Sequence, residues 1–315
     1  VLNPHFNKNA PVPTKSSWIR AMPAVFVLIW STGFIVAKFG LPFAPPLKFL
    51  AIRYTLSIAC FLIWIWLSGA QWPRDKKQWL HLAVVGLTVH AGYLSGVWIA
   101  VKNGMGSGLA ALIVGFQPIL TALWVSGFEN RSVAAFTQPV VTKRQWLGLL
   151  LGLLGLLLVV ARKFSSTQEV TLLTLSATVF ALLCITTGTL YQKKYVVATD
   201  VRTATVIQIG AALAVTLPLT LLESEALTWN LSLISAIIWA AVGLALGGSS
   251  LMFMLVQRGA ATAVTSLLYL VPPTTALMAW VLFDESITLI TILGIVLTAI
   301  GVSLVVRPAK PPTIT

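Results

Sequence analysis

Charged side chains are scarce in this chain: Asp, Glu, Lys and Arg make up 9% of its 315 residues, and only eight are acidic. Soluble domains carry about 25% charged residues, so the composition excludes water as the main solvent of the chain. All eight carboxylates lie at or beyond the ends of long apolar segments. Coupling to protons or sodium through a buried Asp or Glu therefore has no residue to use.

Cysteine is scarce too. Cys60 and Cys184 are the two present, and each falls in the middle of a different apolar segment, which argues against a disulfide or a cysteine metal site. The sequence also lacks the His-Glu-x-x-His and Gly-x-Ser-Gly patterns and any pair of Asp residues within an apolar segment. We expect no catalytic residue, no metal and no cofactor, and therefore not an enzyme.

Apolar residues, in contrast, form 57% of the chain, and the mean hydropathy is +0.92. A helix needs about 20 apolar residues to cross a bilayer. Ten such segments can be marked, at 19–38, 46–68, 78–101, 105–126, 144–162, 171–193, 202–222, 232–256, 261–282 and 287–306. The sequence predicts an all-α membrane protein of ten transmembrane helices with short connections and polar tails at 1–17 and 308–315.

The net charge of +13 is distributed unevenly along these segments. With the N-terminus in the cytoplasm, fifteen of the 21 Lys and Arg residues fall on the cytoplasmic side, as the positive-inside rule requires. We therefore expect both termini in the cytoplasm. No basic run is combined with exposed aromatic residues, so nucleic acid is not an expected partner.

The chain contains an internal repeat. Residues 33–128 align without a gap with residues 188–283, each position 155 further along, and the matches include Gly92 with Gly247. Glycine and proline dominate the matches, and these residues fix backbone shape. We expect two five-helix repeats, 18–162 and 170–307. Because a chain that crosses five times emerges on the opposite side, the second repeat is inverted, around a central cavity as in secondary transporters.

Polar and aromatic residues at mid-depth mark the predicted substrate site. His90 and Tyr93 are three residues apart and share a helix face. Burial of such groups in a membrane is costly unless they face a partner or a wet cavity. Trp30 lies mid-way along its segment, away from the interface where tryptophan usually gathers. We predict that Trp30, His90 and Tyr93 bind the substrate; for His90 and Tyr93 the alternative is a structural hydrogen bond.

Gln117 and Tyr269 complete the predicted substrate site. Gln117 precedes Pro118, and Tyr269 lies one turn before Pro272 and Pro273. Proline removes a backbone donor, so these residues are predicted to kink equivalent helices and to free carbonyl groups that can line a cavity or permit bending. A rigid packing kink is the alternative.

Lys38 and Lys193 occupy equivalent positions in the two repeats. In inverted repeats they lie near opposite membrane faces, where they could attract or release a carboxylate at the two mouths of the cavity. The alternative is anchoring at helix ends by snorkelling. His90 is the mid-segment group that titrates near neutrality, so transport is expected to be driven by the solute gradient or coupled through His90.

These motifs resemble the drug/metabolite transporter superfamily, in particular its EamA-type ten-helix exporters. The resemblance covers nearly the whole chain and rests on Trp30-Ser31-Thr32-Gly33, the segment with Arg53, and two copies of a shared ending, at 110–129 and 266–301. It implies a basket of two inverted halves, with helices one, three, four, six, eight and nine around the cavity and helices five and ten outside. Members of this type export amino acids, aromatic ones included, from bacterial cells.

The expected function is therefore export of small metabolites, foremost amino acids, across the bacterial inner membrane. The partners are a small-molecule substrate and the lipid bilayer, and a monomer is expected because ten helices can use their small-residue stripes internally. The alternatives are transport of nucleosides, organic cations or other metabolites and drugs, or a lipid-translocating or assembly role. Substrate identity does not follow from the fold.

Overall fold

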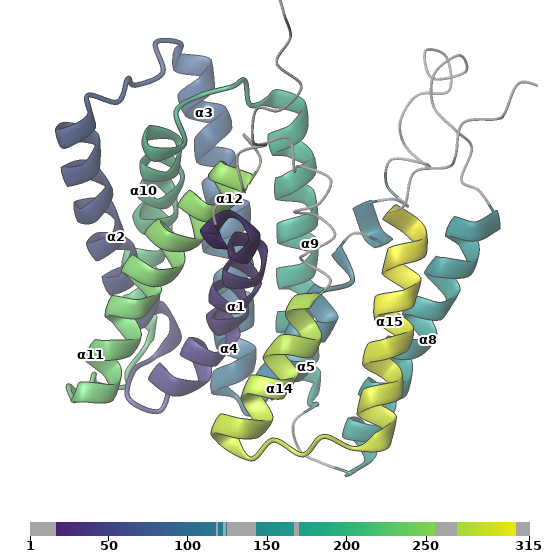
Figure 1. Cartoon of the computed structure of the whole chain (residues 1–315). Helices are drawn as coiled ribbons and strands as arrows, with labels where there is room; N and C mark the ends of the chain where they lie inside the picture. The colour runs from purple at the N-terminus through teal and green to yellow at the C-terminus, as the bar shows by residue number, and fades with distance from the viewer. Residues whose placement is uncertain are drawn as a thin grey trace, which may run out of the picture.

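The computed structural model describes residues 17–117, 119–121, 124, 143–166, 170–255 and 270–306. Every regular element in these residues is a helix (Figure 1). In chain order they are α1 (Ser17–Gly40), α2 (Pro46–Ser68), α3 (Lys76–Val85), η1 (Gly86–Gly92), α4 (Tyr93–Lys102), α5 (Ser107–Val114), α8 (Lys143–Ser166), α9 (Leu172–Tyr195), α10 (Val201–Leu219), η2 (Thr220–Leu222), α11 (Leu231–Ile238), η3 (Trp239–Gly248), α12 (Ser249–Leu255), α14 (Val271–Phe283) and α15 (Leu289–Val306).

Six helical stretches of the described residues are long and apolar enough to cross a membrane: Ala21–Gly40, Pro46–Ser68, Lys76–Lys102, Leu172–Tyr195, Val201–Leu222 and Leu231–Leu251. Four shorter apolar helices fall in the remaining predicted segments. Large apolar side chains cover the outer surface, and Trp66 is 81% exposed. Such a surface is stable against lipid and not against water. The described part of the chain is therefore an all-α membrane structure.

Local chemistry sets the helix ends. Pro46 stands in the first turn of α2, where the missing N–H of proline has no cost. The Glu223 carboxylate accepts the next two N–H groups, at 2.8 Å from Leu47 and 2.9 Å from Lys48. Gly69 ends the same helix in the left-handed conformation, with φ of 63°. The predicted bounds of this helix, 46–68, agree with the structure because the proline that begins the helix and the glycine that follows its end are both visible in the sequence.

Several helix boundaries in the second half of the chain follow those in the first half at a constant spacing. The first and last residues of α1 precede those of α9 by 155 positions, and α3 begins 155 positions before α11. Both repeats contain a π-helical stretch at equivalent positions, η1 in the first and η3 in the second. π-helical turns are rare and concentrate at functional sites. The common offset extends the sequence repeat to the level of backbone conformation.

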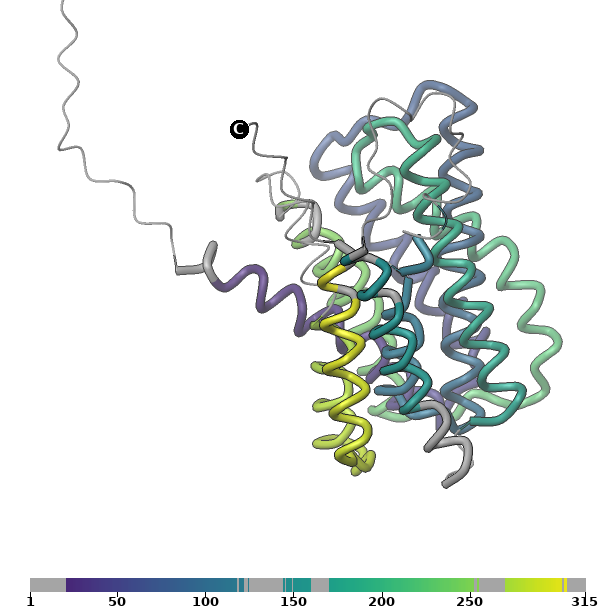
Figure 2. The backbone as a smooth tube through the Cα atoms, turned by 90° about the vertical axis from the view of Figure 1, so that its right-hand side faces the viewer, coloured from purple at the N-terminus to yellow at the C-terminus, as the bar shows by residue number. Residues whose placement is uncertain are grey.

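Helices α8 and α15 pack against each other at one edge of the bundle, away from α2, α10 and α11 (Figures 1 and 2). A Cβ atom on Gly155 would lie 2.5 Å from the carbonyl oxygen of Gly294, and one on Gly301 would overlap the carbonyl of Gly148. The helices are therefore antiparallel and in backbone contact. Gly148 corresponds to Gly294 in the repeat and Gly155 to Gly301, so exchange of the two halves maps one contact onto the other.

Candidate functional site

A cavity of about 130 Å³ lies inside the helical bundle. Its wall comes from α1, α2, η1, α4, α9, α10, η3 and α12. Predicted helices one, three, six and eight line it, as the resemblance implies. The resemblance did not imply a contribution from helices two and seven, which are α2 and α10. Residues of predicted helices four and nine are absent from the wall within the part of the chain described.

Three of the predicted substrate-site residues, Trp30, His90 and Tyr93, come together in the wall of this cavity. Gln117 does not line it, and its amide instead donates to the Thr189 hydroxyl oxygen on α9 at 3.0 Å. Tyr269 and Pro118 lie outside the described residues. The cavity is thus lined by the indole of Trp30 on α1 and by the imidazole of His90 and the phenol of Tyr93 in the third predicted helix.

The backbone around His90 is π-helical, and neighbouring helices support it. The Tyr54 hydroxyl of α2 donates to the carbonyl oxygen of His90 at 2.8 Å. The Gln208 side chain of α10 lies close enough to the His90 side chain to interact with it. The sequence left open a hydrogen bond between His90 and Tyr93, and the structure places the Gln208 side chain beside the imidazole. His90 is therefore held between α2 and α10 at the cavity wall.

Arg53 lines the same cavity, and sequence reasoning did not assign it to the site. The residue is 9% exposed, and its guanidinium carbon lies 5.7 Å from the ring centre of Trp98. By sequence, Arg53 was counted among the 21 cations whose distribution predicts the orientation in the membrane. A usable signal was present, because Arg53 is the one charged residue between Phe49 and Ser68 in an apolar segment. A charged residue is costly to bury within a membrane segment, and this cost alone makes it a candidate functional residue.

Lys38 and Lys193, which were predicted at the two mouths of the cavity, have different environments in the structure. The Lys38 ammonium forms an ion pair of 2.7 Å with Glu285, whose side chain is only 10% exposed. The Glu285 carboxylate also accepts the backbone N–H of Ser107 at 2.9 Å and that of Gly108 at 3.4 Å, at the start of α5. It therefore joins the ends of α1, α5 and α14. Lys193 is exposed.

Pro272 and Pro273 stand in the first turn of α14. Proline at this position leaves no helical hydrogen bond unmade. Pro272 is buried and packs against Gly115, in the residues that follow α5. The chain before it, from 256 to 269, lies outside the described residues, so the kink predicted within a longer helix stays a prediction.

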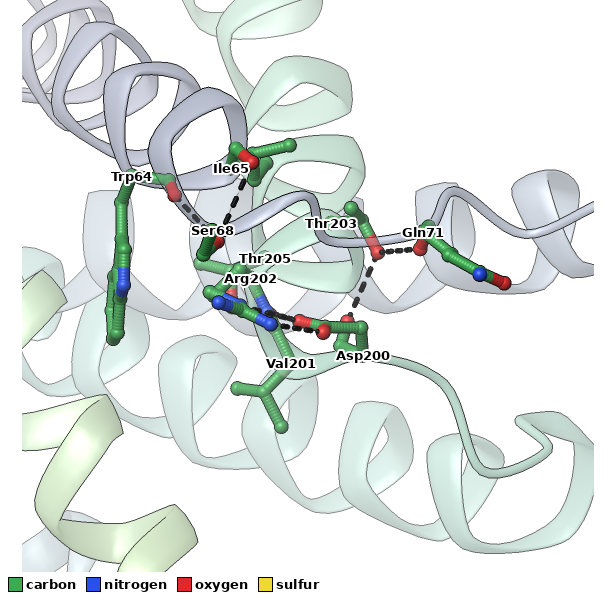
Figure 3. A network of polar contacts seen from close by, with 9 residues as sticks. All are labelled: Trp64, Ile65, Ser68, Gln71, Asp200, Val201, Arg202, Thr203 and Thr205. Atoms are coloured by element: carbon green, nitrogen blue, oxygen red, sulfur yellow. Dashed lines mark hydrogen bonds and ion pairs between the residues drawn. The ribbon is translucent and has the colours of Figure 1, made fainter.

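A network of polar contacts fastens the end of α2 to the start of α10 (Figure 3). The Arg202 guanidinium binds both carboxylate oxygens of Asp200, at 2.9 and 2.6 Å, and lies 5.5 Å from the ring centre of Trp64. Hydrogen bonding to Arg202 holds the pKa of the Asp200 carboxyl below its ordinary value. Thr203 donates to the Gln71 carbonyl at 3.2 Å. The network fixes the two helices that carry Arg53 and Gln208.

The cavity wall contains no carboxylate among the described residues. Glu129 and Glu169 fall in segments outside those residues, and the six other acidic residues lie at helix ends or between helices. No group of three or more His, Cys, Asp or Glu side chains able to hold a metal occurs in the described ranges. The charged side chain in the described wall is Arg53, a cation.

Comparison with known proteins agrees with this architecture. An uncharacterized transporter of Bacillus subtilis, YvbV, is 27% identical over 296 residues, which cover 91% of each chain. A probable amino-acid metabolite efflux pump of Salmonella typhimurium is 24% identical over 286 residues, covering 87% of this chain and 90% of the relative. A crystal structure with 17% identity matches with a TM-score of 0.62, over 90% of this chain and 94% of the other, which shows a shared fold.

A family model matches the chain twice. The EamA-like transporter family accounts for residues 18–161 and again for residues 172–307. These ranges contain every helix of the described structure apart from the first residue of α1 and the last five residues of α8, and they contain all the cavity-lining residues. The chain is an integral membrane protein that belongs to the EamA-like transporter family, within the drug/metabolite transporter superfamily that its motifs resemble.

Proposed function

We propose that this transporter exports small metabolites, foremost amino acids and aromatic ones among them, across the bacterial inner membrane by alternating access. The observation that carries the proposal is the cavity within the helical bundle, where Trp30, His90 and Tyr93 meet. Ligand sites are typically concave and mostly apolar, with a few convergent polar groups. The names of relatives in Salmonella typhimurium and Escherichia coli as probable amino-acid metabolite efflux pumps support the substrate class.

We propose ten transmembrane helices in two inverted five-helix repeats, 18–162 and 170–307, with cytoplasmic tails at 1–17 and 308–315. The common offset of 155 between helix bounds supports the repeat. The antiparallel glycine contacts of α8 and α15, which exchange when the halves are exchanged, support the inversion. In such folds the two halves swap conformations around a site near the midplane.

Lys38 and Lys193 belong to the two ends of the transport path in this proposal. The ion pair of Lys38 with Glu285 closes one end, while Lys193 is exposed at its own. An alternating-access cycle requires two such ends to open in turn. Movement is driven by the gradient of the solute, with coupling through His90 as the alternative. The protein works as a monomer in this account.

Flux measurements test the proposal. Purified protein in proteoliposomes is expected to carry labelled phenylalanine down its gradient, with unlabelled amino acids competing better than nucleosides or organic cations. The Trp30→Ala and His90→Ala variants are expected to lower that flux about tenfold or to change the competition pattern, because each removes part of the cavity wall. Cysteine replacement of Ser68, an exposed residue beyond the cavity, serves as a control with unchanged flux.

The results separate the alternatives. Competition by nucleosides or organic cations, and not by amino acids, would move the substrate class. Absence of flux for every solute tested would favour a lipid-translocating or assembly role. Unchanged flux and selectivity in both cavity variants, at normal expression, would contradict the site assignment.

A further inference from the structure

We infer that Arg53 binds an anionic group of the transported solute, a carboxylate, inside the cavity. The inference rests on the proposed function and names its substrate class: solutes with a carboxylate head and an apolar body. It starts from the charge of the cavity wall, where a buried cation faces no carboxylate among the described residues.

The Arg53 guanidinium makes no hydrogen bond and no ion pair with any described residue, although five N–H groups are available on it. The residue is nine-tenths buried. Contact with the Trp98 ring stabilises the cation less than burial without a counter-ion destabilises it. A buried arginine without a counter-ion would be stabilised by binding an anion, and the described part of the chain does not supply one.

The repeat shows what is missing beside Arg53. Gln208 lies 155 positions after Arg53 and occupies the equivalent place on α10. There it is paired with His90. The residue equivalent to His90 in the second repeat is Ala245, which lines the cavity together with Arg53 and offers only a methyl group. One half of the protein satisfies its polar residue internally, whereas the other leaves a cation open to the cavity.

A second donor points to the same ligand chemistry. The indole N–H of Trp98 is buried and has no hydrogen-bond acceptor, and Trp98 lines the cavity beside Arg53. The Tyr54 hydroxyl, in contrast, is used by the His90 carbonyl. Arginine matches the planar geometry of a carboxylate with two parallel hydrogen bonds. Two unsatisfied donors in one cavity are suited to an acceptor with two oxygens.

The rest of the wall is apolar and aromatic, with Phe34, Leu94 and Ile209 among its residues. An apolar body fits such a surface once the head group is paired with Arg53. An organic cation without an acidic group meets charge repulsion in the same place. The cavity is therefore expected to distinguish an acid from its amide, which has nearly the same shape and no charge.

Ligand-dependent stability of the purified full-length protein tests this directly, with 3-phenylpropionate and 3-phenylpropanamide as probes. A ligand that binds the folded state raises the midpoint of thermal unfolding, and at a given concentration the rise is larger for a ligand that binds more tightly. From that rise, the acid is expected to bind the wild-type protein about 10- to 100-fold more tightly than the amide, as a charge-assisted hydrogen-bonded pair implies. Arg53→Gln should abolish the difference, and Arg53→Lys should keep part of it.

Two further variants make the test independent of the folding of Arg53→Gln. Trp98→Phe keeps an aromatic ring and removes the N–H, and it should weaken acid binding a few-fold and amide binding less, because a hydrogen bond to a charged acceptor is the stronger one. Lys48→Gln is the matched control, because Lys48 is a cation of the same helix whose ammonium donates to the Glu225 carbonyl at 2.6 Å, outside the cavity. It should leave both probes unaffected.

The outcomes are distinct from those of the flux experiment. Equal binding of acid and amide by the wild-type protein would overturn the inference, even where phenylalanine flux is present. A preference for the acid that survives in Arg53→Gln would overturn it as well. A preference that is lost in Arg53→Gln supports the anion site, even where phenylalanine flux is absent and the proposed function fails.

Discussion

Gly86→Ala is expected to destabilise the protein strongly, by about 3 kcal/mol or more in the free energy of unfolding, which is the upper end for an overpacked core. Gly86 begins η1, and a Cβ atom there would overlap the backbone carbonyl of Gln208 and lie 2.7 Å from its Cα. Backbone atoms cannot rotate away as a flexible side chain can. The methyl group would push α10 from the helix that carries His90.

Gly210→Ala is the matched control for this prediction. Gly210 lies two residues after Gln208 on α10, and a Cβ atom there would meet no heavy atom within 4 Å. Because alanine favours helix more than glycine does, this variant should be neutral or slightly stabilised. Thermal unfolding of the two variants in detergent makes the comparison. Similar midpoints would show that η1 and α10 are not in backbone contact.

Glu285→Ala is expected to open the end of the protein that the ion pair of Lys38 with Glu285 is proposed to close. The carboxylate holds Lys38 and two backbone N–H groups of α5, so its removal leaves a cation and two donors without their acceptor. Lys38 is 33% exposed, and solvent screens its share of the loss. We estimate a cost of about 2–3 kcal/mol, which shifts the equilibrium toward the open end by about 30- to 150-fold.

Cysteine reactivity measures that opening. Ser107 is buried at the start of α5, so in a background with Cys60 and Cys184 replaced by alanine the Ser107→Cys thiol should react slowly with an impermeant reagent. Adding Glu285→Ala should raise its rate. Glu225→Ala is the control, because this side chain is 61% exposed and its ion pair with Lys102 contributes little. Equal rates in all three proteins would exclude a closing role for Glu285.

The helices were predictable from the sequence because apolar segments mark their positions and proline, glycine or capping residues mark their ends. Proline, glycine and Asp75, which caps α3, stand at the ends of helices as expected. The π-helical turns were not predictable, since one additional residue per turn leaves the apolar pattern of a fully apolar helix unchanged. They bring His90 against Gln208 and the Tyr54 hydroxyl, contacts that depend on helix rotation and not on sequence spacing.

The lining of the cavity was predictable in part. Trp30, His90 and Tyr93, which line it, were selected because polar or aromatic residues are costly to bury at mid-depth in a membrane, and their binding of a solute stays a prediction. Arg53 was missed because it was counted with the cations of the membrane surface, although its position within the segment separates it from them. Gln117, a polar residue before a proline, was predicted to line the cavity, but it does not lie in the wall described, and its amide donates to the Thr189 hydroxyl oxygen.

Equivalent positions in the two repeats need not share an environment. The alignment gave Lys38 and Lys193 the same role, yet the first is paired with Glu285 and the second is exposed. The proposed inverted repeat, alternating between two states, would place its halves in different conformations at any moment. A sequence repeat therefore predicts which residues are related and not which of them is engaged.

The proposed function requires that a solute occupies the cavity. Protection of an introduced thiol tests it most directly, with Ser249→Cys in the cavity wall and Ser68→Cys at the exposed end of α2, each without the native cysteines. Phenylalanine and other amino acids are then titrated during modification by a small thiol reagent. The account predicts that modification at 249 slows in a saturable way, while modification at 68 does not change. Modification at 249 that no amino acid slows would contradict it.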